Sequence, residues 1–245
     1  KQLKEWIDYI DKLAKDKNID GMVIKLGNVQ AGMGKKREMH NALLRFKNSN
    51  KKIIVYSENY ISGSDYYLTS MANEIYTHRM SGIDLKGLNM EMTFIRGLLD
   101  TLSIVPEVIR VSPYKTAGDM FVNRNMSDEM RENYSELIDD LYNIYVNDIS
   151  NARGWTTENT INIIDNGPYW NSLDAIDKNI ITGVMFPDQF DNYVKELNDE
   201  NINIKKSSKS YYLDDYVYKW VEEEKPQIAV IYAVGGIISG ESNPG

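Results

Sequence analysis

Residues 110–121 (RVSPYKTAGDMF) contain the side chains best suited to chemistry in this sequence. The segment continues the apolar run 108–111 (VIRV), which predicts a buried strand. Pro113 stiffens the exit from that strand, and Lys115 follows at its C-terminal end. In open α/β sheets, ligands and reacting groups gather at this edge. A lysine amine there is a candidate general base, although a solvated surface lysine is the more common role of such a residue.

Nucleotide-binding motifs are incomplete in this chain. The string GMGK at residues 32–35 resembles the end of a P-loop, but that motif needs glycine in place of Val29 and serine or threonine in place of Lys36. The third glycine of a dinucleotide-binding fingerprint is also missing, and no G-x-S-x-G nucleophile elbow occurs. The residues therefore predict no nucleotide cofactor.

Metal and thiol chemistry have few residues to use. The chain has no cysteine, which excludes disulfides, thiolate zinc sites and a cysteine nucleophile. Its 2 histidines, His40 and His78, do not have the HExxH spacing. Asp139 and Asp140 are adjacent in a predicted helix, where a solvated face is the ordinary role for such a pair. We therefore predict no metal site.

Composition and charge narrow the class of protein. The 245 residues, of which 42% are hydrophobic and 26% charged, are typical of a globular protein that buries a core without disulfides. The net charge of −8 argues against nucleic acid as a partner. The sequence opens on an amphipathic helix rather than a signal peptide. Its longest apolar stretch, residues 228–238, is much shorter than the roughly 20 residues that cross a bilayer.

The apolar residues alternate between helical spacing and short continuous runs bounded by turn residues. The predicted helices cover residues 3–14, 39–46, 90–102 and 128–152, with two or three shorter ones between 156 and 200. The predicted strands cover residues 22–26, 53–56, 74–77 and 108–111. Ser127 is a suitable N-cap for the longest helix, and Gly154 is a suitable end. Strands that alternate with helices predict an α/β fold with a mostly parallel sheet.

Several strings of the sequence resemble one known family. YKTAGDMF at residues 114–121, followed by MSDEMRE at 126–132, resembles the signature of signal peptide peptidase A, also called protease IV. Met120 departs from that signature, in which proline is usual. The resemblance extends over nearly the whole chain. The other strings that fit the family are SENYISGSDYYLTSMANEIY at 57–76, IDLKG at 83–87 and IAVIYAVGGIISGES at 228–242.

The resemblance implies a domain organisation. The long form of the family is a tandem duplication of a ClpP/crotonase-like α/β repeat with flanking helices. Residues 1–205 would form most of the first repeat, without its opening strand. Residues 206–226 would be a connector, and residues 227–245 would be the opening strand of a second repeat that this chain lacks. A membrane anchor would precede Lys1.

The activity that the resemblance implies is that of a serine endopeptidase with a Ser–Lys dyad. Lys115 matches the family's lysine. It would take the proton of the serine hydroxyl as general base and later deliver it to the leaving amine. The serine would lie beyond Gly245, together with the donors of the oxyanion hole. We therefore expect this chain alone to be inactive.

Serines within the chain do not fit the nucleophile's place. The loop at residues 28–34 corresponds to the serine loop of the second repeat, and it contains no serine. Ser57, Ser62 and Ser64 lie in the next loop, and we interpret them as capping or turn residues.

A lysine that acts as general base must lose its proton. With an ordinary pKa of about 10.4, a lysine is almost wholly protonated at neutral pH. Burial against apolar groups disfavours the charged form, so we expect Lys115 to be excluded from water when the second repeat covers it. Asp119, four residues further on, would oppose this effect if its carboxylate faced the ammonium. We therefore expect that carboxylate to point outward.

The resemblance also implies the setting in which the protein works. Its substrates would be hydrophobic peptides, chiefly remnant signal peptides. Met120, Phe121 and Val122 are placed either to line a groove for them or to pack beneath Lys115. We expect a homo-oligomer, a tetramer as in the family, attached to the membrane through an anchor outside this chain. The location would be the bacterial inner membrane, with the catalytic part on the periplasmic side.

Two other functions are compatible with the same fold. A non-catalytic pseudo-peptidase scaffold would have lost the serine, although the presence of Lys115 argues mildly against it. A crotonase-type acyl-CoA enzyme shares the repeat, but its chemistry has no role for the YKTAGD lysine. A serine in a glycine-rich loop after Gly245 would separate both from the peptidase.

Overall fold

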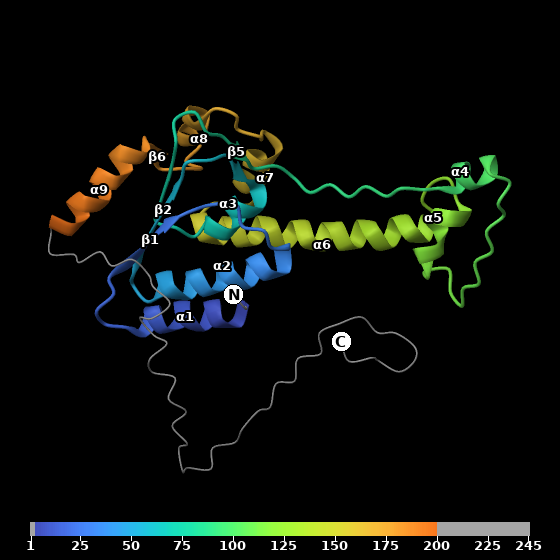
Figure 1. Ribbon diagram of the computed structural model, residues 1–245, viewed down its shortest axis with the longest axis horizontal. Coiled ribbons are helices and arrows are strands. Elements are labelled where there is room, and N and C mark those ends of the chain that lie inside the picture. Colours follow the sequence, from blue (N-terminus) through green and yellow to red (C-terminus); the bar gives the residue numbers. More distant parts are fainter. Residues whose placement is uncertain (1–2, 200–245) are drawn as a thin grey trace, which may run out of the picture. The chain divides into compact units, whose positions relative to one another are not determined.

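Four parallel strands form the main sheet, in the order β1-β2-β4-β6 (Figure 1). The computed structural model describes residues 3–199. The strands are Gly21–Lys25 (β1), Lys52–Ser57 (β2), Glu74–Thr77 (β4) and Gly183–Val184 (β6). All of β2 after its first residue is buried, as expected for a parallel strand that is covered on both faces. The predicted α/β fold with a mostly parallel sheet is confirmed.

A smaller parallel sheet lies beside the first. It pairs Ile61–Ser62 (β3) with Ile83–Asp84 (β5). β3 leads directly into α3 (Gly63–Thr69), whose N-cap is Ser62. The turn between strand and helix therefore places several polar side chains close together at the start of α3.

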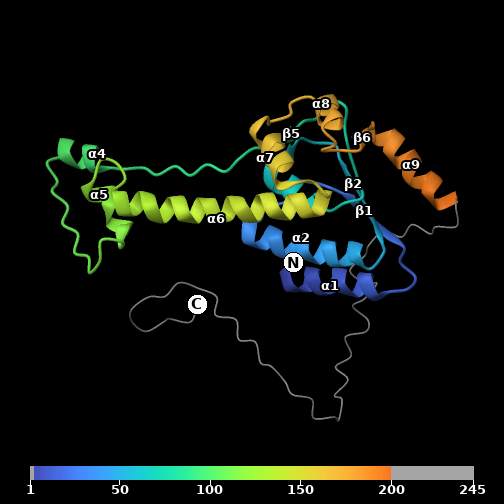
Figure 2. The ribbon, with the colours of Figure 1, turned by 180° about the vertical axis from the view of Figure 1, so that it is seen from behind.

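Helices cover both faces of the main sheet (Figures 1 and 2). α9 (Pro187–Asp199) packs on one face through Phe190, whose ring stacks on Tyr56 with the centroids 4.3 Å apart. Ile54 shares that face, because alternate residues of a strand point the same way, and it joins the same buried cluster. α1 (Leu3–Lys15), α2 (Met33–Asn48) and α3 lie on the other side.

The long helix α6 (Asp128–Arg153) extends from the sheet into a separate arm, which consists of residues 88–127 and the first half of α6 (Figures 1 and 2). Ser127 caps the helix by accepting a hydrogen bond from the backbone N–H of Met130, and Gly154 ends it in the left-handed conformation, with φ of 67°. Both predicted ends of this helix are confirmed. The arm also contains α4 (Arg96–Thr101), a 3₁₀ turn (Thr116–Gly118) and α5 (Asp119–Val122).

Most other predicted elements form within a few residues of their expected bounds. The strand expected at 74–77 is β4, and the helix expected at 39–46 begins earlier, at Met33, as α2. The region from 156 onward contains α7 (Thr157–Asp165), α8 (Ser172–Asp177) and α9. Local apolar patterning was therefore a good guide inside the sheet domain.

Two predictions about the arm were wrong. The helix expected at 90–102 forms only as α4, and the strand expected at 108–111 does not form. Ile109 is 99% exposed and Val111 is 94% exposed. An apolar run becomes a strand only when a neighbouring strand takes its hydrogen bonds and a surface covers it. Within the described part of the chain, nothing pairs with this segment, so Lys115 does not lie at the edge of a sheet.

The domain boundaries stay predictions. The end of the first repeat at residue 205, the connector at 206–226 and the strand at 227–245 lie outside the described residues.

Candidate active site

Lys115 lies in the arm, on a loop between Arg110 and Asp119. It stands directly before the 3₁₀ turn Thr116–Gly118, and its backbone N–H donates to the carbonyl oxygen of Ser112 at 3.0 Å. Its side chain is exposed. Among residues 3–199 it forms no ion pair. The predicted base is therefore presented to solvent from a structured turn.

Tyr114 attaches this loop to α6. Its hydroxyl donates to Oε2 of Glu132 at 2.8 Å, and its carbonyl oxygen accepts from Nδ2 of Asn133 at 3.4 Å. The Glu132 carboxylate raises the pKa of Tyr114, because ionising the hydroxyl would remove the hydrogen bond and place two negative charges together. The residue before Lys115 is thus held on the helix by both its backbone and its side chain.

Asp119 is the most buried polar group of the loop, with 1% of its surface exposed. Oδ1 accepts from Nη1 of Arg110 at 2.7 Å, and Oδ2 accepts from Oγ of Ser127 at 2.6 Å. The carboxylate is therefore directed at these two donors rather than at Lys115. Both of its oxygens are bonded to donors other than Lys115, as the hypothesis requires, but the carboxylate is held inside the arm by Arg110 and the cap of α6 rather than pointing outward.

The two ends of the loop also touch at Gly118. A Cβ atom added to this glycine would lie 2.5 Å from Cγ1 of Val108. Such a distance is far below van der Waals contact, so only glycine lets Val108 approach this closely. Together with the Arg110–Asp119 ion pair, this contact closes residues 108–119 into a compact loop.

The serines of the sheet domain have structural roles. Ser62 accepts from the backbone N–H of Asp65 at 3.1 Å and so caps α3. Oγ of Ser57 donates to the carbonyl oxygen of Asn59 at 3.0 Å. Capping and turn roles are confirmed for these two residues. Within the described residues, the hydrogen bonds of Ser57, Ser62 and Ser64 all go to residues outside the arm. Ser64 belongs to the cluster described next.

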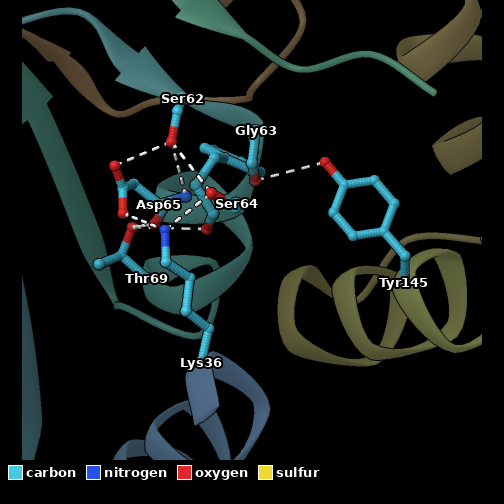
Figure 3. Close-up of polar contacts among 8 residues, drawn as sticks. Lys36, Ser62, Gly63, Ser64, Asp65, Thr69 and Tyr145 are labelled. Atoms are coloured by element: carbon cyan, nitrogen blue, oxygen red, sulfur yellow. Dashed lines mark hydrogen bonds and ion pairs between the residues drawn. The ribbon is translucent and has the colours of Figure 1, made fainter. Parts of the chain in front are cut away.

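Sequence reasoning missed a buried cluster around Lys36 (Figure 3). Nζ of Lys36 lies 2.7 Å from Oδ1 of Asp65 and 2.7 Å from Oγ of Ser64. The side chains of Lys36 and Asp65 are only 3% and 7% exposed. Oγ of Ser62 donates to the other carboxylate oxygen at 2.8 Å. In the sequence, Lys36 stands out only as the residue that departs from the P-loop motif.

This lysine–serine pair is not arranged as a base and its nucleophile. Nζ of Lys36 donates to Oγ of Ser64 and to Oδ1 of Asp65, so the lysine gives a hydrogen bond to the serine oxygen rather than accepting the serine's proton. The cluster instead joins the first turn of α2 to the first turn of α3. It satisfies the polar groups that this junction buries.

The described residues contain no group of three or more acidic or histidine side chains placed to hold a metal ion. Within the same range, no helix is both long enough and apolar enough to cross a membrane. Asp139 and Asp140 are exposed on α6, as expected of a solvated face.

The parallel sheet with helices on both faces defines an α/β protein, an architecture that agrees with the ClpP-like fold of the family that the sequence matches. Residues 45–201, which include the whole arm, match the sequence model of peptidase family S49. The chain belongs to this family. The predicted relationship to signal peptide peptidase A, or protease IV, is thereby confirmed.

Three relatives support the assignment. The chain is 30% identical over 241 residues to the Arabidopsis thaliana protein named "Serine protease SPPA, chloroplastic", covering 95% of this chain and 34% of the relative. It is 32% identical over 145 residues to "Protease 4" of Haemophilus influenzae, covering 59% of this chain and 23% of the relative. It is 29% identical over 253 residues to "Protease 4" of Salmonella typhi, covering 98% and 40%. The chain thus spans well under half the length of these relatives.

Proposed function

We propose that this chain is part of a serine endopeptidase with a Ser–Lys dyad, in which Lys115 is the general base. The observation that carries this proposal is the state of Lys115 within residues 3–199: its side chain is exposed and forms no ion pair, while the residue before it is bonded to α6. A base needs an amine that no carboxylate holds in its charged form. Membership of family S49 and the names of the relatives support the same activity.

In the proposed reaction, Lys115 accepts one proton from the serine and then donates it to the leaving amine. The neutral amine of Lys115 takes the proton of the serine hydroxyl as the serine oxygen bonds to the peptide carbonyl carbon. The ammonium then gives this proton to the leaving amine as the carbon–nitrogen bond breaks. Water attacks the resulting ester in a second round of the same proton transfers, which releases the acid and restores the serine.

The nucleophile is proposed to lie beyond Gly245. Within the sheet domain, Ser57 and Ser62 serve as turn and cap residues, and Ser64 is bonded to Lys36. The second half of the longer protein would supply the serine and the oxyanion hole, so this chain alone would be inactive. The same half would cover Lys115 and exclude water from it.

Substrate and setting complete the proposal. The substrates would be hydrophobic peptides, chiefly remnant signal peptides, cleaved by a homo-oligomer, a tetramer as in the family, on the periplasmic side of the bacterial inner membrane. A membrane anchor outside this chain would attach it. The arm carries exposed apolar side chains that suit a groove or a contact between subunits, namely Leu98, Leu102, Ile104, Val105, Ile109, Val111 and Phe121.

A fluorophosphonate probe, which labels activated serines, tests the central claim. The full-length protein would be compared with Lys115→Ala and with Lys35→Ala, which removes an exposed lysine of the sheet domain. We expect K115A to label at least a hundredfold more slowly than the parent, with K35A unchanged. Equal labelling of the parent and K115A would refute the dyad. A folded parent that does not label at all would favour the pseudo-peptidase scaffold.

A further inference from the structure

The loop that carries Lys115 is closed by one carboxylate. Asp119 is bonded through Oδ1 to Arg110, nine residues earlier, and through Oδ2 to Ser127, eight residues later. Ser127 in turn caps α6. One buried side chain therefore connects the segment that enters the loop, the turn that follows Lys115 and the start of the long helix.

The same two hydrogen bonds also direct the carboxylate that lies nearest to Lys115 in the sequence. Asp119 is the only acidic residue within four positions of Lys115 in either direction. Only the 3₁₀ turn Thr116–Gly118 separates the two residues along the chain. Arg110 and Ser127 each bond one oxygen of the Asp119 carboxylate, and the side chain is only 1% exposed.

We infer that Arg110 and Ser127 are positioning residues of the peptidase, which act through Asp119 to hold the Lys115 loop on α6 and to withhold the carboxylate from the lysine. This inference rests on the proposed function of Lys115. It adds two residues that act through Asp119, and it explains how an acidic residue can stand four positions from a general base.

The test is the rate of fluorophosphonate labelling of the full-length protein. Arg110→Met frees Oδ1, and we expect labelling to slow at least fivefold. Adding Asp119→Asn removes the released charge, so R110M/D119N is expected to label at least threefold faster than R110M. Arg110→Lys keeps a cation at this position and is expected to retain at least a third of the parental rate. Arg124→Met, which breaks the ion pair with Asp100 in the same arm, is the matched control.

The outcomes separate this inference from the proposed function. If K115A labels like the parent, the dyad itself fails. If K115A is slow but R110M loses less than fivefold, or if D119N restores less than threefold, only the positioning role is overturned. Rescue of R110M by D119N would show that the freed carboxylate, rather than the absence of the guanidinium itself, slows labelling.

If near-UV circular dichroism shows that R110M does not fold, the labelling rates of two variants at Ser127 test the inference instead. Ser127→Ala frees the other carboxylate oxygen and is expected to label at least threefold more slowly, whereas Ser127→Thr keeps the hydroxyl and is expected to match the parent. Equal rates for S127A and S127T would overturn the inference.

Discussion

Nζ of Lys36 and Oδ1 of Asp65 lie 2.7 Å apart, and both side chains are almost completely buried. The pair joins α2 to α3 across a separation of 29 residues in the sequence. Each buried charge needs the other as its partner, so the contribution of the pair to stability can be measured by removing one side chain.

Removing one partner of this pair should be costly. Lys36→Met leaves the Asp65 carboxylate buried without its cation, and we expect the free energy of unfolding to fall by about 3–5 kcal/mol. Chemical denaturation of the parent and of K36M measures this change. Lys35→Met, one residue earlier and exposed, is the control and should change stability by no more than about 0.5 kcal/mol. The double variant K36M/D65N should lose less than K36M alone, because the unpaired charge is gone; an equal or larger loss would contradict this account.

The contact between Gly118 and Val108 should be sensitive to a single methyl group. Gly118→Ala places Cβ against Cγ1 of Val108, and we expect the loop to be locally destabilised by about 1–2 kcal/mol, which is roughly 5- to 30-fold faster amide exchange at residues 108–119. Hydrogen exchange with mass spectrometry reports this loop directly. Val108→Ala in the same chain should restore slow exchange. Gly97→Ala, which meets no atom within 4 Å, should leave exchange in this loop unaltered.

His40 should make stability depend on pH below neutrality. Burial lowers the pKa of its imidazole below the ordinary 6.5, although the carbonyl oxygen of Tyr67, 2.9 Å from Nδ1, acts in the opposite direction. As the pH falls, the imidazole of the unfolded chain therefore binds a proton at a higher pH than the imidazole of the folded chain. The contribution of His40 is complete above about pH 6.5 and is lost as the pH falls below that value.

Two measurements check this prediction. The imidazole of His40, followed by NMR, should titrate below pH 6.5. The free energy of unfolding of the parent between pH 5 and 7 should rise more steeply with pH than that of His40→Asn, in which this group is absent. Parallel slopes for the two proteins would show that His40 does not contribute.

Tyr66 should have the opposite effect at alkaline pH. Its hydroxyl is fully buried and donates to the carbonyl oxygen of Ile180 at 2.9 Å, and burial raises its pKa to about 12. A tyrosine in the unfolded chain ionises near pH 10, so stability should fall as the pH rises from about 10 to 12. Tyr66→Phe removes this titration. Unfolding measured at pH 9, 10 and 11 should show a shallower fall for Y66F, and an equal fall would exclude Tyr66 as a source.

Local signals determined much of this protein. Ser127 and Gly154 set the ends of α6 through interactions with neighbouring residues, so the two positions could be read without knowing the fold. The apolar run of β2 likewise predicted a strand, because a buried parallel strand needs little more than continuous hydrophobicity. The string around Lys115 predicted the family, which the match over residues 45–201 confirmed.

Only the tertiary structure decided the environments of the charged residues. The run at 108–111 is apolar enough for a strand, yet it lies in an arm where no strand pairs with it among the described residues. Nothing near Lys36 in the sequence points to Asp65, and nothing near Asp119 shows that Arg110 and Ser127 would bond both of its oxygens. Caps and strands depend on adjacent residues, whereas burial and charge pairing depend on which distant surface comes to cover a side chain.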